Sequence, residues 1–218
     1  MINTMNVVVL ISGGGTNLQA LIDGQLDKTL PITIQSVISN KADAYGLERA
    51  KLAGINTDVL DHKAFDSREA FDQAMIKIID QYKPELVVLA GFMRILTPEF
   101  TRHYLGRMIN IHPSLLPKYQ GLHTHKRAIE AGDKEHGCSV HFVTEELDGG
   151  PVAMQAVVPI EKNDTPETLA TRVLTQEHII FPESVKLFAE KRLTMGENSS
   201  VLDGTALPAH GLLINNFK

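Results

Sequence analysis

Cysteine and aromatic residues are scarce in this sequence. Among 218 residues there is one cysteine, there is no tryptophan, and aromatic residues make up 6%. The single thiol, Cys138, rules out a disulfide within the chain and a cluster of thiolate metal ligands. A lone cysteine most often packs as a small buried hydrophobic residue. Together with the lack of a targeting segment, this composition indicates a protein of the reducing cytoplasm.

Long apolar runs and clusters of positive charge are also missing. The N-terminal apolar stretch begins at Val7 and ends at the polar Ser12, whereas a membrane-spanning helix needs about 20 apolar residues. The stretch also lacks the basic segment of a signal peptide, so we expect a strand there. The formal net charge is −5, with no run of lysine or arginine. We therefore expect neither nucleic acid nor a membrane as a partner.

Short β-branched runs alternate with segments of helical period. The expected strands are residues 6–11, 32–39, 57–60, 85–90 and 107–112, and several are apolar at consecutive positions. Strands covered on both faces have this pattern. Between them, one helical face follows Asp66 and Glu69, which have the spacing of a capping box. The residues of this face are Phe71, Met75, Ile78, Ile79 and Tyr82. The alternation predicts an α/β fold with a mostly parallel sheet and helices on both faces.

The pattern changes after residue 135. Residues 137–144 and 151–160 are expected to form two adjacent strands, an antiparallel hairpin pair at the sheet edge. A long helix follows, capped by Asp164 or Thr165, with Pro166 in its first turn and a kink at Pro182. From about residue 196 the sequence has no strong pattern.

A glycine-rich loop, SGGGTNL, follows the first strand directly. Consecutive glycines let the backbone turn tightly and direct its N–H groups at an anion, while Thr16 and Asn17 can cap the next helix. The loop predicts a phosphate site at the carboxyl end of the sheet. It matches neither the P-loop nor the dinucleotide pattern, because Leu18 takes the place of the third glycine. A glycine turn without function is the alternative.

An apolar loop, LAGFMRILTP at residues 89–98, follows the fourth expected strand. It contains Phe92, Met93, Ile95 and Leu96 before Thr97 and Pro98, which are expected to start a helix. An apolar loop at the ligand-binding end of a sheet suits a flat aromatic ligand. Core packing is the alternative interpretation.

Asn110 and His112 end the fifth expected strand two residues apart, so both side chains project from one face of the sheet. Asp148, followed by two glycines, could approach His112 from the neighbouring hairpin and favour the imidazolium by its charge. The three residues predict an active site with a histidine as the acid. Each also has an alternative: a loop-binding amide, a structural histidine and an ordinary turn.

The longest motifs of the chain are SGGGTNLQALI, LAGFMRIL, NIHPSLLPKYQGLHTH and HGCSVHFVTEELDGGP. Together they resemble the phosphoribosylglycinamide formyltransferases of purine synthesis, within the wider formyltransferase family, over nearly the entire chain. The resemblance implies a Rossmann-like fold and formyl transfer from 10-formyltetrahydrofolate, a co-substrate, to the amine of the glycinamide ribonucleotide, with no metal. The catalytic residues of the family fall on Asn110, His112 and Asp148.

The resemblance also implies the residues that bind the two substrates. The ribonucleotide residues are Gly13, Gly14, Gly15, Thr16 and Asn17 for the phosphate, and Glu177 for the glycinamide part. The folate residues are Arg68, Met93, Arg94, Ile95, Leu96, Asn110, Thr144, Leu147 and Asp148. Glycine at 14 and threonine at 16 depart from the usual family loop, but neither removes a backbone donor.

The chemistry suits these residue types, because an amine attacking a formyl carbon makes a tetrahedral intermediate whose oxygen becomes negative. Asn110 would donate an amide N–H to this oxygen. His112, kept protonated by Asp148, would be a charged donor to it and would later give a proton to the departing folate nitrogen. Asp148 could also relay the amine proton through an ordered water.

The resemblance implies a single formyltransferase domain over residues 1–195, with a phosphate-binding half of about 1–105 and a folate and catalytic half of about 106–195. Residues 196–218 would form a carboxyl-terminal extension. We expect small-molecule substrates and a monomer or weak homodimer in the cytoplasm.

Four other functions are alternatives for these residues. A formyltetrahydrofolate hydrolase would use the same three residues on water but would not need the phosphate loop. A methionyl-tRNA formyltransferase would need a further domain for tRNA. A non-catalytic nucleotide-binding module would leave the three residues unused. A metal hydrolase would have to use His112, His123, His125, His136 and His141, whose spacing matches no metal motif.

Overall fold

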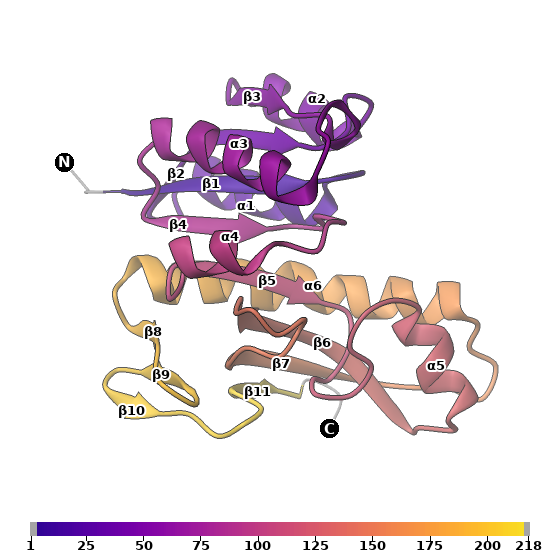
Figure 1. Cartoon of the computed structure of the whole chain (residues 1–218). Coiled ribbons are helices and arrows are strands. Elements are labelled where there is room, and N and C mark those ends of the chain that lie inside the picture. The colour runs from indigo at the N-terminus through magenta and orange to yellow at the C-terminus, as the bar shows by residue number, and fades with distance from the viewer. Residues whose placement is uncertain (1–3, 216–218) are drawn as a thin grey trace. The chain divides into compact units, whose positions relative to one another are not determined.

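The computed structural model describes residues 4–215 (Figure 1). The chain forms two compact units, the first extending to Ile109 and the second beginning at Asn110. Each unit is α/β and is described by itself. The predicted α/β class with a mostly parallel sheet is confirmed, whereas the predicted division at residues 105 and 195 stays a prediction.

The first unit contains parallel strands in the order β4-β1-β2-β3. Helices α1 and α2 lie on one face of these strands and α3 and α4 on the other (Figure 1). Its elements are β1 (Met5–Ile11), α1 (Thr16–Leu26), β2 (Ile32–Ser39), α2 (Tyr45–Leu52), β3 (Asn56–Val59), the short turn η1 (His62–Ala64), α3 (Arg68–Gln81), β4 (Leu86–Leu89) and α4 (Pro98–His103).

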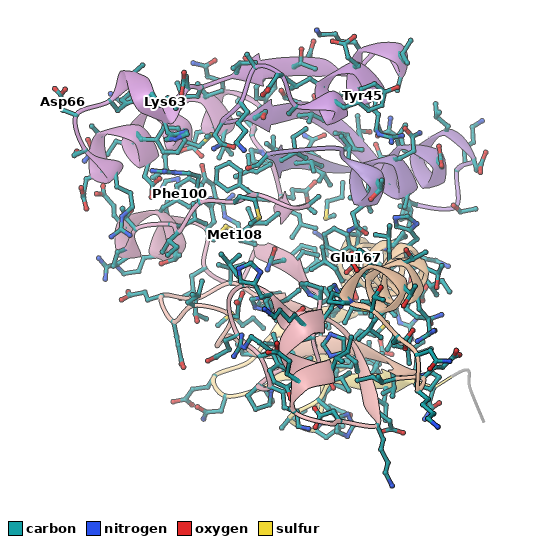
Figure 2. All side chains as sticks on the ribbon, turned by 90° about the vertical axis from the view of Figure 1, so that its right-hand side faces the viewer. Tyr45, Lys63, Asp66, Phe100, Met108 and Glu167 are labelled. Carbon is teal, nitrogen blue, oxygen red and sulfur yellow. The ribbon has the colours of Figure 1, made fainter. Side chains whose placement is uncertain are left out.

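The core of the first unit comes from these strands and from the inner faces of the helices. β1 and β4 are buried at almost every position, as expected for strands covered on both faces. Phe71, Met75 and Ile79 bury the predicted face of α3, and Phe100 of α4 lies inside the unit (Figure 2). Burying each such side chain contributes roughly 1.5–3 kcal/mol relative to leaving it exposed.

The start of α3 differs from the prediction by one residue. Ser67, not Asp66, is the N-cap, and its hydroxyl accepts from the Ala70 N–H at 3.0 Å. Asp66 is exposed and points away from the unit (Figure 2). Serine and aspartate are equally good caps, so the capping preference alone could not separate two neighbouring positions. Thr97 and Pro98 start α4 as predicted, with the Thr97 hydroxyl accepting from the Phe100 N–H.

The second unit holds strands in the order β11-β7-β6-β5 and a separate antiparallel sheet β10-β9-β8. Helix α6 packs on β6 and β7, and α5 packs on α6. The elements are β5 (Met108–His112), which begins at the end of the first unit, α5 (Thr124–Glu130), β6 (Glu135–Phe142), β7 (Val152–Pro159), α6 (Pro166–Ala189), β8 (Leu193–Met195), β9 (Ser200–Leu202), β10 (Thr205–Ala206) and β11 (Leu212–Ile214).

The predicted hairpin is present, but it is not at the edge of the sheet. β6 and β7 pair antiparallel, and the late strand β11 pairs parallel with the outer side of β7. The segment after residue 196, which has no strong sequence pattern, therefore contains strands. These strands are two or three residues long and partly exposed, too short to show an alternation of polar and apolar residues.

The long helix α6 begins as predicted, with Thr165 as N-cap and Pro166 in the first turn. Asp164, the other predicted cap, is not the N-cap. Its carboxylate instead accepts a hydrogen bond from Arg172 Nη1 at 2.6 Å. Hydrogen bonds from Arg172 hold the pKa of Asp164 below its usual range. Pro182 lies inside the helix, which continues through it to Ala189. Of the helices in residues 4–215, none is long and apolar enough to cross a membrane.

Candidate active site

The second unit brings together the three residues predicted to be catalytic. His112 Nδ1 lies 3.5 Å from Asp148 Oδ2, and both side chains are more than nine-tenths buried. Asn110, two residues before His112 on β5, is half-buried and projects from the same face of the strand. The approach of the β6–β7 connection to the end of β5, predicted from the sequence, is therefore seen.

Both ring nitrogens of His112 face acceptor atoms. Nε2 lies 2.9 Å from the Tyr119 carbonyl oxygen, and Nδ1 faces the Asp148 carboxylate. A neutral imidazole carries one N–H and can donate to only one of them, whereas the imidazolium can donate to both. The geometry therefore offers an acceptor to each N–H of an imidazolium.

Asn110 is oriented by a second histidine, His141 on β6. His141 Nδ1–H donates to the Phe142 carbonyl oxygen at 2.9 Å, which leaves Nε2 as the acceptor for Asn110 Nδ2, 3.2 Å away. Burial lowers the pKa of His141, in keeping with a neutral ring. One amide hydrogen of Asn110 is thereby engaged.

From the sequence, His141 is predicted only as one of the histidines of a metal site whose spacing matches no motif. One signal could have identified it: an imidazole among the apolar residues VHFV of a predicted strand needs a partner when buried. His141 Nε2 also lies 3.7 Å from Asp148 Oδ1, so the carboxylate stands between two histidines. His141 is a member of the site that spacing alone did not predict.

The turn that carries Asp148 depends on Gly150. Asp148 itself has φ 50, a left-handed conformation that aspartate and asparagine adopt more readily than most residues. A Cβ on Gly150 would collide with the Phe142 carbonyl oxygen, so only glycine fits there. Of the predicted folate residues on this segment, Thr144 is half-buried and Leu147 is exposed.

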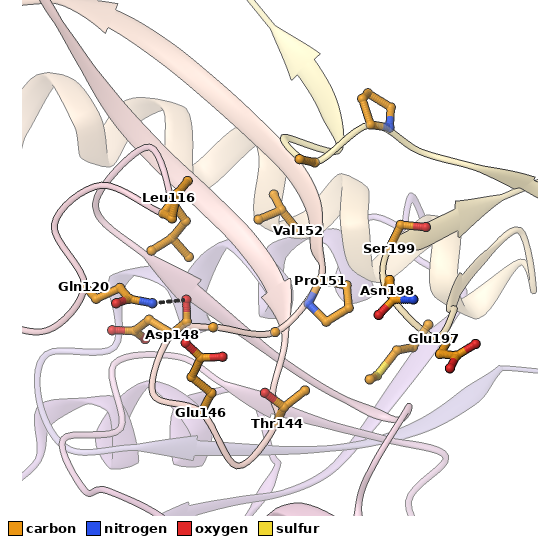
Figure 3. Close-up of a pocket in the computed structure, with 16 residues that line it drawn as sticks. Leu116, Gln120, Thr144, Glu146, Asp148, Pro151, Val152, Glu197, Asn198 and Ser199 are labelled. Atoms are coloured by element: carbon orange, nitrogen blue, oxygen red, sulfur yellow. Dashed lines mark hydrogen bonds between the residues drawn. The ribbon is translucent and has the colours of Figure 1, made fainter.

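The segment between β5 and α5 lies against His112 and Asp148. Besides the Tyr119 carbonyl at His112, the Gly121 N–H donates to Asp148 Oδ2 at 2.9 Å. Gln120 Nε2 donates to the Asp148 carbonyl oxygen at 3.4 Å (Figure 3). In this conformation the segment supplies backbone partners to both members of the pair.

A cavity of about 430 Å³ opens beside the same turn (Figure 3). Thr144, Glu146 and Asp148 line one side of it, and Glu197 and Asn198, between β8 and β9, line another. The carboxyl-terminal extension, for which the sequence predicts no site, therefore forms one wall of a cavity next to Asp148.

Glu177 is buried on α6, with 8% of its surface exposed. Burial, with a smaller contribution from the Glu177 charge, raises the pKa of the Cys138 thiol. Cys138 is buried and inert in this setting, as predicted. Within residues 4–215, no three histidine, cysteine, aspartate or glutamate side chains are grouped so that they could hold a metal ion.

The glycine loop lies in the first unit, between β1 and α1. Gly15 is the N-cap of α1 with φ 72, and no side chain caps this helix. The prediction that Thr16 and Asn17 are caps is wrong, because the left-handed turn at Gly15 places both residues inside the first turn of α1. The first backbone N–H groups of α1 consequently remain free of a side-chain cap, which suits an anion.

Ser12 joins the glycine loop to the apolar loop after β4. Its hydroxyl donates to Asn40 Oδ1 at 2.6 Å and accepts from the Met93 N–H at 2.8 Å, while its own N–H donates to the Gly91 carbonyl oxygen. The two loops predicted to bind different substrates are thus connected through one buried side chain.

The apolar loop exposes alternate side chains. Met93 and Ile95 are 61% and 59% exposed, whereas Phe92 is buried. Arg94 and Leu96 are half-buried. The core-packing alternative therefore holds for Phe92 but not for Met93 and Ile95, whose apolar surfaces are open to a ligand.

Arg68, the remaining predicted folate residue, is exposed at the start of α3. Asp72, one turn later, is buried and accepts from the Thr97 N–H at 2.7 Å, which ties the end of the apolar loop to α3. Desolvation raises the pKa of Asp72, although Thr97, Arg68 and Arg94 act in the opposite direction.

The chain is similar to known proteins along almost its full length. A model of the formyl transferase family matches residues 5–185. The sequence is 59% identical to a phosphoribosylglycinamide formyltransferase of Escherichia coli (strain K12), over 95% of this chain and 98% of the relative. It is 51% identical to that of Haemophilus influenzae, over 94% and 97%. The solved phosphoribosylglycinamide formyltransferase from Coxiella burnetii superposes with a TM-score of 0.93 at 55% identity, covering 97% of this chain and 99% of that one. The chain therefore belongs to the formyl transferase family.

Proposed function

We propose that this protein transfers the formyl group of 10-formyltetrahydrofolate to the amine of 5-phosphoribosylglycinamide in purine biosynthesis. The names of the relatives support the reaction, at 59% and 51% identity over nearly whole chains. The observation that carries the mechanism is the contact of His112 with Asp148, beside an Asn110 amide held by His141.

The proposed chemistry begins when the amine attacks the formyl carbon and the formyl oxygen becomes an oxyanion. His112 Nε2–H and the second amide hydrogen of Asn110 are the donors for it. The Tyr119 carbonyl, 2.9 Å from Nε2, occupies the position of an acceptor that the formyl oxygen would replace. Such donors stabilise a transition state because they are oriented before the charge develops.

Two proton transfers complete the reaction. The attacking amine must lose a proton, and the departing folate nitrogen must gain one. Asp148, whose carboxylate faces His112 and His141, would accept the first through a water, and His112 would supply the second. All bonds are made and broken between the two substrates, so neither a covalent enzyme intermediate nor a metal is needed.

The substrate residues are proposed from the family motifs. Gly13 to Asn17 would bind the ribonucleotide phosphate with backbone N–H groups at the start of α1, and Glu177 the glycinamide part. The folate would lie on the exposed apolar side chains of Met93 and Ile95 with Thr144 to Asp148 beside the pterin, and Arg68 would face its carboxylates.

The substrates are small molecules, and we further propose a monomer or weak homodimer located in the cytoplasm. The phosphate-binding half would comprise about residues 1–105 and the folate and catalytic half about 106–195. An enzyme of purine biosynthesis works where its soluble substrates are made, which supports this location.

A spectroscopic assay of folate deformylation tests the proposal. Deformylation is measured with and without glycinamide ribonucleotide, at equal enzyme concentration. We expect turnover only when the amine is present, with one formyl group appearing on the ribonucleotide for each folate consumed. Turnover that needs no amine would identify a hydrolase instead.

A further inference from the structure

Arg49 on α2 lies against the glycine loop and belongs to no motif discussed so far. Its Nε–H donates to the Gly14 carbonyl oxygen at 2.8 Å, and Nη1 donates to Gln19 Oε1 of α1 at 3.2 Å. Its guanidinium carbon also lies 5.1 Å from the centre of the Tyr45 ring. The guanidinium is therefore held at a fixed position by three neighbours.

The contact with Gly14 determines where the loop N–H groups point. In a trans peptide the C=O and the following N–H point in opposite directions. Since Arg49 holds the Gly14 oxygen, the Gly15 N–H is directed away from Arg49. The Gly46 N–H holds the Gly13 oxygen in the same way, at 3.0 Å, which directs the Gly14 N–H. Two consecutive loop N–H groups are thus oriented by donors from α2.

The loop and α2 approach so closely that only glycine fits at the contact. A Cβ on Gly15, which has φ 72, would lie 2.7 Å from Gly46 Cα, and a Cβ on Gly46 would lie 3.3 Å from Gly15 Cα. This close approach brings the Arg49 side chain within reach of the loop backbone. A charged donor on a carbonyl oxygen also polarises the peptide, so the Gly15 N–H becomes a stronger donor.

The charge of Arg49 is not neutralised by its surroundings. Its helical neighbour Glu48 pairs with Lys51, at 2.8 Å. Within the part of the chain that the structure describes, no carboxylate lies within ion-pair distance of Arg49. A positive charge thus stands behind the loop whose N–H groups face the other way.

We propose that Arg49 is a positioning residue for the substrate phosphate, which acts through the Gly14–Gly15 peptide and adds a positive field to the loop. The inference rests on the proposed function, since the phosphate is that of the ribonucleotide. It predicts that Arg49 contributes to recognition of the phosphate and not to the chemistry at the amine.

The test compares two amine substrates, glycinamide ribonucleotide and the riboside that lacks its phosphate. Arg49→Met keeps most of the stem but removes the N–H donors and the charge, and Arg49→Lys keeps the charge without the donor fork. Lys51→Met is the matched control, because it removes a positive charge from the same helix without contacting the loop.

For Arg49→Met we expect kcat/KM for the ribonucleotide to fall about tenfold or more, mostly through KM, as for loss of a charged hydrogen bond. For the riboside, kcat/KM should change less than about twofold. For the ribonucleotide, kcat/KM of Arg49→Lys should lie between those of Arg49→Met and the native enzyme, and kcat/KM of Lys51→Met should equal that of the native enzyme. The inhibition constant of inorganic phosphate against the ribonucleotide should rise with the KM. If the riboside reacts too slowly to measure, this inhibition constant replaces it as the measure of phosphate recognition in each variant.

An equal loss for both substrates, or an unchanged inhibition constant for phosphate, would show that Arg49 merely supports the fold. If native enzyme transfers no formyl group to the ribonucleotide, the proposed function fails. If native enzyme does so and Arg49→Met retains the full preference for the phosphorylated substrate, only the role of Arg49 fails. Thermal unfolding tests whether Arg49→Met is folded. If it is not, Arg49→Lys takes its place, and an unchanged preference of that variant for the ribonucleotide over the riboside would overturn the proposal.

Discussion

The partnership of His112 and Asp148 makes a quantitative prediction for variants of the pair. The informative changes are His112→Ala, Asp148→Asn and their combination. Asparagine suits position 148 because the backbone there has φ 50, which asparagine tolerates well. Its side-chain oxygen can still accept from the Gly121 N–H, so the substitution removes the charge and keeps the turn.

The size of the effect follows from the contact distance and the burial. At an effective dielectric constant of about 20, opposite charges 3.5 Å apart attract each other by about 5 kcal/mol. Desolvation of two nearly buried groups offsets part of that attraction. Removing one donor that stabilises an oxyanion typically costs about 3 kcal/mol, or roughly a hundredfold in turnover. We therefore expect each single variant to lose about a hundredfold or more in kcat, with little change in either KM.

The double variant distinguishes a working pair from two separate residues. If Asp148 acts through the imidazole, the double variant should be about as slow as the slower single one. Independent losses would multiply to about ten-thousandfold, and that result would refute the partnership. Folate absorbance measures turnover in each case. Asp133→Asn is a suitable control, because Asp133 binds the same segment through the Tyr119 hydroxyl at 2.8 Å and should leave kcat nearly unchanged.

Three further predictions concern the loops and the stability. Gly15→Val places a branched side chain at a left-handed position against α2, and steady-state kinetics should show KM for the ribonucleotide rising far more than KM for the folate. Arg68→Ala should weaken folate binding about tenfold on titration and spare the ribonucleotide, whereas unchanged folate affinity would exclude its role. Burial lowers the pKa of His136 to about 4. In the unfolded chain the pKa of this histidine is about 6.5, so between pH 6.5 and 4 the unfolded state binds a proton that the folded state does not. The free energy of unfolding should therefore fall by up to about 3 kcal/mol over that range. His136→Asn should flatten that part of the urea-unfolding profile, and an equally steep profile would assign the acid sensitivity elsewhere.

Most of the fold could be predicted because the central strands are covered on both faces. Such strands read as continuous apolar runs, and residues 32–39 match β2 at both ends. The errors lie where tertiary contacts decide between equivalent residues. Ser67 and Asp66 are both good caps, so the capping preference could not distinguish them, and the structure has Ser67 as the cap.

The part of the candidate site that consists of side chains near strand ends could be predicted from the sequence. Asn110, His112 and Asp148 follow from that rule and from the family motifs. The Tyr119 carbonyl could not be predicted, because a backbone oxygen has no residue identity. Arg49 was missed because its partner, Gly14, is 35 positions away and the contact depends on how α2 packs.

Because β11 pairs with β7, the carboxyl-terminal extension from residue 196 protects the sheet from self-association. Leu212, Leu213 and Ile214 occupy the hydrogen-bonding edge beside residues 154–156 of β7, an apolar strand of high β-propensity. Without them the eight-residue strand β7 would offer its unpaired N–H and C=O groups to any extended chain nearby, whereas β11 presents an edge of only three residues. Residues with no part in the proposed chemistry can therefore decide how much of the enzyme stays in solution.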